Sequence, residues 1–279
     1  MGIARPPDPQ PVARTPGVGL VIAAGIGMAG GLLSLLPTSQ SHLAVLWLPN
    51  AFLVALLVIR PDLKPVPIIL VGCLATALAN MARGEMLLPA LLMAAANIAS
   101  VGVNLAVLRW LFPHAPSFAR PSYILRIALA ALFGGVVSAL IGAPTIAYYH
   151  DEALLTQFGR WLVSDGLAMM LFVPLIVQIA DYRAAPPTER PRLFTVVWVT
   201  ALVLAVAVAV FSVGAGPTLY LLPPAVVVAT LVLGPLGAAL AVAASAAVAL
   251  PLTHMGYGPA AFLYDSWPRQ LQFLELYCV

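Results

Sequence analysis

Long apolar runs alternate with short polar breaks along almost the whole chain. Most runs are about 18 to 25 residues long, which is the length that crosses a hydrocarbon core of roughly 30 Å as a helix. The breaks contain proline, glycine or charged residues, which end helices. This pattern predicts membrane segments at residues 17–36, 43–59, 64–81, 88–112, 122–147, 157–180, 193–212, 218–233 and 236–253, with a tenth that begins near residue 269.

The predicted fold class is therefore all-α, a polytopic transmembrane helix bundle with eight to ten membrane segments. The least defined part is the pair 218–233 and 236–253, because only a Gly-Pro-Leu-Gly turn without charge separates them. A full hairpin and a re-entrant hairpin both fit this pattern. Either form returns the chain to the same side of the membrane at residue 254.

Composition agrees with a membrane protein, since 62% of the 279 residues are hydrophobic and 8% are charged, against roughly 25% charged residues in soluble domains. Residues 1–16 hold five prolines and two arginines and lack an apolar signal-peptide core. They are predicted to form a disordered cytosolic tail ahead of one integral membrane domain, residues 17–279. Cys73 and Cys278 lie in separate apolar segments and indicate neither a disulfide framework nor a metal pair.

Basic residues predict the orientation, because cytoplasmic loops of membrane proteins retain an excess of Lys and Arg. A cytosolic N-terminus places ten of them inside and three outside. The sequence pI of about 9.1 then reflects topology and indicates no nucleic-acid partner. The inside set is Arg5, Arg14, Arg60, Lys64, Arg109, Arg120, Arg126, Arg183, Arg190 and Arg192, and the outside set is Arg83, Arg160 and Arg269.

Asp165 is the strongest candidate for a functional residue. It lies about two helical turns into the segment 157–180, one turn after Trp161. A carboxylate near the centre of a membrane helix costs roughly 2.5 to 3.5 kcal/mol on insertion scales, so it should face the bundle interior and either pair or take up a proton. Two interpretations remain open: a sensing or ligand-binding acid, and a structural hydrogen bond to an amide, an indole or a free backbone N–H.

Several asparagines are placed to meet Asp165. Asn97, Ser100 and Asn104 share one face of their segment, and Asn50 lies in the second segment. Interhelical hydrogen bonds of this kind average only about 0.6 kcal/mol. Structural bonding between helices and contact with a ligand are both compatible with these positions, as they are for Asn80.

Two tryptophans and a proline complete the set. Trp47 and Trp161 are expected near the outer membrane interface, where indole rings commonly act as anchors. Pro49 is expected close to a helix start, where its missing N–H is tolerated. Asn50, which follows it, is expected to turn inward toward Asp165.

Small residues form two stripes at helical spacing. Gly134, Ser138 and Gly142 make one, and Gly27 and Gly31 make the other. Such stripes allow close approach of membrane helices. Tight packing within one chain and a dimer interface are both possible uses.

No catalytic motif is present: the sequence has no phosphate-binding glycine loop, CxxC, HExxH or GxSxG. His42, His150 and His254 are expected on the outer side and could in principle hold Zn²⁺, but their spacing matches no metal site. We therefore expect no catalytic residue, no metal and no cofactor.

Four stretches, in order, resemble one family. "LWLPNAFLVALLVIRP" carries a Trp-x-Pro start of an early helix, "ANIASVGVNLAVLRWLF" an Asn-led helix with a basic and aromatic end, "FGRWLVSDGLAMMLFVPLIV" a Trp-x-x-x-Asp segment that ends at a proline, and "HMGYGPAAF" a Gly-x-Gly-Pro loop. These features resemble the first-described type of bacterial membrane-associated sensor (MASE) domain. The resemblance covers residues 17–279.

The resemblance implies an input module of a signalling protein in the bacterial inner membrane. Such modules pass a signal through their last helix to a cytosolic output, such as a diguanylate cyclase, a phosphodiesterase or a histidine kinase. The chain ends eleven residues into that helix, so we expect it to be truncated and the output to follow Val279. A homodimer or a partner membrane protein is compatible with this role.

A small-molecule transporter or channel is the alternative, because transporters often contain broken helices. The ligand-sensing or signal-sensing candidates are Asp165, Trp161, Trp47, Pro49, Asn50, Asn97 and Asn104.

Overall fold

The computed structural model describes residues 16–35, 44, 46–112, 122–213 and 216–259. Within these ranges all regular secondary structure is helical, with no strand. The elements are α1 (Pro16–Leu35), α2 (Leu48–Ile59), α3 (Pro65–Ala82), α4 (Leu87–Leu111), α5 (Ser122–His150), α6 (Leu154–Ala184), α7 (Leu193–Val213), the 3₁₀ helix η1 (Gly216–Leu221), α8 (Leu222–Leu233) and α9 (Pro235–His254).

The predicted segments agree closely with these helices. Seven of the described helices, α1, α3, α4, α5, α6, α7 and α9, are long and apolar enough to cross a membrane. This confirms an all-α multi-pass membrane protein. The tail, the loop around residue 117 and the helix expected near residue 269 lie outside the described residues.

The second segment is the main correction. A helix was expected over residues 43–59, but α2 begins at Leu48 and has 12 residues, which corresponds to about 18 Å at 1.5 Å per residue. It is therefore too short to cross the membrane alone. Ala44, Leu46 and Trp47 precede it in non-helical conformation.

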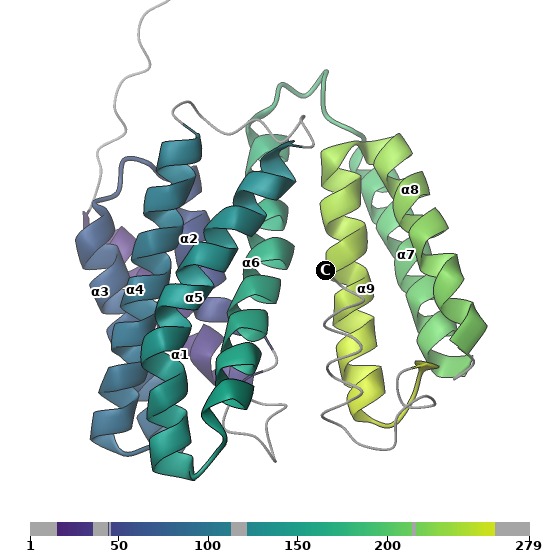
Figure 1. The fold of residues 1–279 in the computed structure, drawn as a ribbon. Coiled ribbons are helices and arrows are strands. Elements are labelled where there is room, and N and C mark those ends of the chain that lie inside the picture. Colours follow the sequence, from purple (N-terminus) through teal and green to yellow (C-terminus); the bar gives the residue numbers. More distant parts are fainter. Residues whose placement is uncertain (1–15, 36–43, 45, 113–121, 214–215, 260–279) are drawn as a thin grey trace, which may run out of the picture.

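The helices form two groups that meet at α6 and α9 (Figure 1). In the first group, α2 lies at the centre and packs against α1, α3, α4 and α6. The second group is α7, α8 and α9. Its contact with α6 is apolar and includes Leu167 and Leu171 of α6 and Ala246 of α9.

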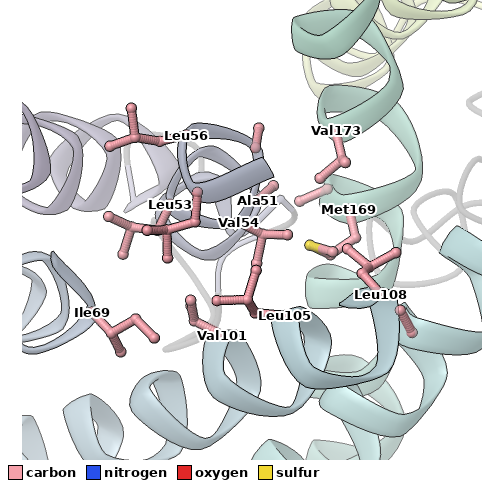
Figure 2. Close-up of a cluster of buried hydrophobic side chains, with 14 of the residues drawn as sticks. Ala51, Leu53, Val54, Leu56, Ile69, Val101, Leu105, Leu108, Met169 and Val173 are labelled. Atoms are coloured by element: carbon pink, nitrogen blue, oxygen red, sulfur yellow. The ribbon is translucent and has the colours of Figure 1, made fainter. Parts of the chain in front are cut away.

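The core of the first group surrounds α2. Figure 2 shows Leu53 and Val54 of α2 directed toward Val101 and Leu105 of α4, with Met169 of α6 nearby. All five side chains are buried. A short helix that is enclosed by other helices along most of its length must be apolar on several faces, and this explains why α2 is apolar apart from Asn50.

The second group settles the hairpin question. The residues of η1 and α8 together extend about 30 Å, at 2.0 Å per residue for a 3₁₀ helix and 1.5 Å for an α-helix. The 20 residues of α9 extend about the same distance. In Figure 1 α8 runs back beside α7 and α9 returns beside both, so the pair is a full hairpin.

Both glycine-containing stripes serve packing within the chain. A Cβ at Gly27 of α1 would lie 2.0 Å from the Gly72 carbonyl oxygen of α3, and one at Gly31 would lie 3.0 Å from Cβ of Ala79. The backbones of α1 and α3 therefore touch. Gly134 and Gly142 of α5 allow the close approach of side chains from α4 and α6.

Substitution of Gly27 by alanine should destabilise the protein, by about 1 to 3 kcal/mol, because the added methyl group overlaps backbone that cannot rotate away. Gly25, two residues earlier, has no atom within 4 Å of its Cβ position. Gly25→Ala should leave the thermal unfolding temperature in detergent unchanged or raise it, since alanine favours a helix. Equal unfolding temperatures for the two variants would contradict the contact between α1 and α3.

Single cysteines in a background without Cys73 and Cys278 should report the orientation. The alternation of the helices together with the excess of basic residues in cytoplasmic loops predicts Asp62 and Pro187 in the cytosol and Asp151 outside. A membrane-impermeant thiol reagent added to intact cells should label position 151 and miss positions 62 and 187. Labelling of position 187 in intact cells would contradict the predicted orientation.

Candidate functional site

Asp165 of α6 is buried in the first group, with 2% of its surface exposed. Three side chains from three other helices reach its carboxyl group. Asn50 of α2 donates from Nδ2 to Oδ1 at 2.9 Å, and Ser100 of α4 donates from Oγ to Oδ2 at 2.5 Å. Ser138 of α5 places its Oγ 3.4 Å from Oδ2. The carboxyl group therefore joins α2, α4, α5 and α6.

Asp165 and Ser100 both lie well inside their helices. Asp165 is eleven residues after the start of α6 and Ser100 is thirteen after the start of α4, which corresponds to about 16 and 20 Å along each helix. Both helices start at the same end of the bundle and are long and apolar enough to cross a membrane. The carboxyl group is therefore expected within the hydrocarbon core, which is roughly 30 Å thick.

The start of α2 is held at this depth by hydroxyl groups of its neighbours. Ser164, next to Asp165, donates from Oγ to the Ala44 carbonyl at 2.7 Å and accepts the Trp47 N–H on its own carbonyl at 3.4 Å. The Leu48 N–H donates to Ser34 Oγ of α1 at 3.0 Å. Non-helical backbone is tolerated at membrane depth only where protein satisfies it, and these bonds do so.

Trp47 lies beside Ser164 through its backbone N–H, and its side chain is partly exposed. Its expected role as an anchor at the outer interface stays a prediction. Pro49 occupies the first turn of α2, where its missing N–H leaves no broken bond, as predicted. Its ring packs close to Gly30 of α1, where an added Cβ would lie 3.3 Å from Pro49 Cγ.

A chain of amides extends the site to α3. Asn50 Nδ2 also donates to Asn97 Oδ1 of α4 at 3.2 Å, and Asn97 Nδ2 donates to Thr76 Oγ1 of α3 at 3.2 Å. Thr76 in turn donates to the Cys73 carbonyl at 2.7 Å. This chain of hydrogen bonds runs from Asp165 through α2 and α4 to α3, where it ends on the backbone.

Trp161 is linked to the carboxyl group through Ser138. It is 7% exposed, its Nε1 donates to Ser138 Oγ at 3.1 Å, and a Cβ at Gly142 would overlap its ring. Trp161 is therefore buried between α5 and α6 and not at the lipid interface where it was expected. Through Ser138 its indole fixes the hydroxyl group that faces Asp165.

Asn104 supports the site from the next turn of α4. Its Nδ2 donates to the Ser100 carbonyl at 2.9 Å and to Ser100 Oγ at 3.2 Å. A Cβ at Gly134 of α5 would lie 2.0 Å from Asn104 Nδ2. Only glycine at position 134 leaves room for this amide.

The electrostatics of the site are unusual. No ion pair to Asp165 occurs in the part of the chain that the structure describes, where the pairs are Arg60 with Asp62, His150 with Glu85 and Arg160 with Glu152. The favourable contributions to a negative charge come from side-chain dipoles and from the N-terminal end of α2, which carries partial positive charge. The carboxyl group is hydrogen-bonded without a paired cation.

Three polar atoms at the site are buried and have no hydrogen-bond partner within the described residues. They are Asn50 Oδ1, Asn104 Oδ1 and Trp47 Nε1. Two of them are acceptors and one is a donor. Unpartnered buried atoms of this kind call for an explanation in a native structure.

The predicted placement of Asp165 is confirmed, since it faces the bundle core with Trp161 and asparagines of the second and fourth helices. Asn50 contacts it directly, and Asn97 and Asn104 do so through one further residue. Asn80 stays apart and points its amide at Met93 Sδ, 3.8 Å away.

Sequence reasoning missed part of the site. Ser138 was interpreted as a packing residue, although its position between Gly134 and Gly142 already placed it on an inward face. Ser34, Thr76 and Ser164 carried no signal of their own, because isolated hydroxyl residues are common in membrane helices. The one available signal for Ser164 was its position directly before Asp165 in the sequence.

The described residues contain no group of three His, Cys, Asp or Glu side chains that could hold a metal. His150 Nε2 lies 3.3 Å from a Glu85 carboxylate oxygen in an ion-pair arrangement at the C-terminal end of α5. His42 and the side chain of His254 lie outside the described residues.

Comparisons with known proteins agree with the geometry. Neither the curated proteins nor the solved structures give a match. Residues 17–267 match the MASE1 family, a bacterial membrane domain with a sensory and non-catalytic role. The match includes α1 to α9 and the whole polar site. The chain therefore belongs to the MASE1 family of membrane-associated sensor domains.

Proposed function

We propose that the buried centre at Asp165 is where this sensor domain perceives its signal. The observation that carries the proposal is a membrane-centre carboxyl group that is hydrogen-bonded by α2, α4 and α5 and has no basic partner among the described residues. Ionisable groups inside membrane proteins are expensive and commonly functional. Any change at the carboxyl group alters bonds to three helices at once.

The arrangement of α6 and α9 supports a route from the centre to the second group of helices. Leu167 and Leu171 follow Asp165 by two and six residues and pack against Ala246 of α9. Leu46, which precedes the start of α2, packs into the same apolar cluster. A movement of α6 or of the α2 start would therefore reach α9 directly.

Packed interfaces change between discrete arrangements and do not deform continuously. In this proposal the signal shifts α6 and the α2 start against α9, and the segment after α9 carries the shift to a cytosolic signalling output. A diguanylate cyclase, a phosphodiesterase and a histidine kinase are all suitable outputs. The helix expected near residue 269 is the proposed link, and it lies outside the described residues.

One observation favours the alternative, a small-molecule transporter. Transporters bind substrates near the membrane centre at discontinuous helices, and α2 starts there beside Asp165. Against this, α2 is enclosed by α1, α3, α4 and α6. The experiment below therefore includes a transport arm.

The first experiment joins the chain to a cytosolic diguanylate cyclase domain after Val279 and measures cyclic di-GMP in bacterial cells. Asp165→Asn keeps the shape of the side chain and removes its charge, so the output should be locked at one level whatever the growth condition. The control is Asn80→Ala, which removes a buried amide outside the site. It should keep the wild-type response.

Membrane insertion and unfolding temperature are measured for both variants, so that a folding defect is recognised. Normal regulation in Asp165→Asn would contradict the sensing role. Solute movement into liposomes that contain residues 1–279, at rates above empty liposomes, would replace it with transport.

A further inference from the structure

The centre at Asp165 holds more acceptor atoms than donors can satisfy. The two carboxylate oxygens accept from one amide and from the Ser100 hydroxyl. The single proton of the Ser138 hydroxyl is shared between Asp165 Oδ2 at 3.4 Å and the Gly135 carbonyl at 3.1 Å. Asn50 Oδ1 and Asn104 Oδ1 have no partner among the described residues, although both side chains are 0% exposed. Each amide is bonded to the carboxyl group, Asn50 directly and Asn104 through Ser100. The surplus acceptors therefore belong to one cluster.

The chemistry of this cluster limits what could occupy it. A water molecule would supply donors but no positive charge. A proton would neutralise the carboxylate but supply only one donor, and Trp47 Nε1 is neutral and can serve at most one oxygen. A hard metal cation accepts several oxygen ligands at once and neutralises charge.

We propose that Asp165, Asn50 and Asn104 form a binding site for one Na⁺ ion. This inference rests on the proposed function and names the ligand class of that centre. A single carboxylate balances a single positive charge, whereas a divalent ion would leave a net charge far from water. The carboxylate, amide and hydroxyl oxygens are all ligands that hard cations prefer.

The close packing favours a small ion. Gly134 gives room to the Asn104 amide only because it lacks a Cβ, and Gly142 does the same for the Trp161 ring on the other side. At both positions the α5 backbone lies directly against a buried side chain of a neighbouring helix. A larger K⁺ ion would have to separate α4, α5 and α6.

Ion binding would also change the amide chain. In the structure Asn50 directs Nδ2 to both Asp165 and Asn97. To ligate an ion beside the carboxylate, its amide rotates about Cβ–Cγ and presents Oδ1 instead. The bond to Asn97 Oδ1 is then lost unless the Asn97 amide reverses as well and accepts from Thr76. Occupancy at α6 is thereby transmitted to α4 and α3.

The test uses the full chain in detergent at constant ionic strength. NaCl should raise the unfolding temperature by several degrees in a saturable manner, as expected for a ligand that binds only the folded state, whereas choline chloride and KCl should not. Radioactive ²²Na⁺ should bind once per chain. Asp165→Asn should abolish both effects, and Asn104→Ala should weaken Na⁺ binding by about tenfold.

Asn80→Ala is the matched control and should retain wild-type Na⁺ binding, because its amide lies outside the cluster. If Asp165→Asn does not fold, Asn104→Ala decides, since it leaves the carboxyl group intact. Equal unfolding temperatures in sodium and choline would overturn the proposal. A response to pH alone, lost in Asp165→Asn, would also overturn it by assigning the centre to a proton.

The sodium-binding test and the cyclic di-GMP reporter test can give negative results independently, so they distinguish the ion site from the sensing role. No sodium effect, together with an altered output of Asp165→Asn in the reporter, removes the ion and keeps the sensing role. Sodium binding without any effect of Asp165→Asn on the reporter keeps the ion site and removes the sensing role.

Discussion

The burial of one carboxyl group without a basic partner constrains this bundle more than any other interaction. Insertion scales put its cost at roughly 2.5 to 3.5 kcal/mol near a membrane centre, and hydrogen bonds to a charged group contribute about 1.5 to 3 kcal/mol each. Asn50, Ser100 and Ser138 supply these bonds from three helices. The carboxyl group can be accommodated only while α2, α4 and α5 hold their positions around α6.

The short α2 helix follows from the same constraint. If the helix extended to residues before Leu48, the backbone groups there would bond within the helix and would no longer bond to Ser164 and Ser34. Because the helix stops there, its N-terminal end and Asn50 face the carboxyl group from the side that carries partial positive charge. A broken helix at membrane depth is costly in lipid, but this one is enclosed by other helices.

The long helices could be predicted because the length of each apolar run and the residues that end it determine where a membrane helix lies. The inward placement of Asp165 and Asn50 could be predicted because polar side chains within the membrane require partners. The start of α2 could not be predicted, since residues 46–48 are apolar. The non-helical backbone before Leu48 depends on the Ser34 hydroxyl and the Ser164 carbonyl, which lie in distant segments. The burial of Trp161 was missed for a related reason. Interface preference is an average over lipid-facing indoles, and the local partner of Trp161, Ser138, overrides it.

The most direct measurement is a double-mutant cycle between Asn50 and Asp165, with alanine at each position and at both, followed by unfolding in detergent. The account predicts a coupling free energy of about 1.5 to 3 kcal/mol, the contribution of a hydrogen bond to a charged group. The double variant should then be less destabilised than the sum of the single variants. Additive effects of the two substitutions would contradict the claim that this bond joins α2 to α6.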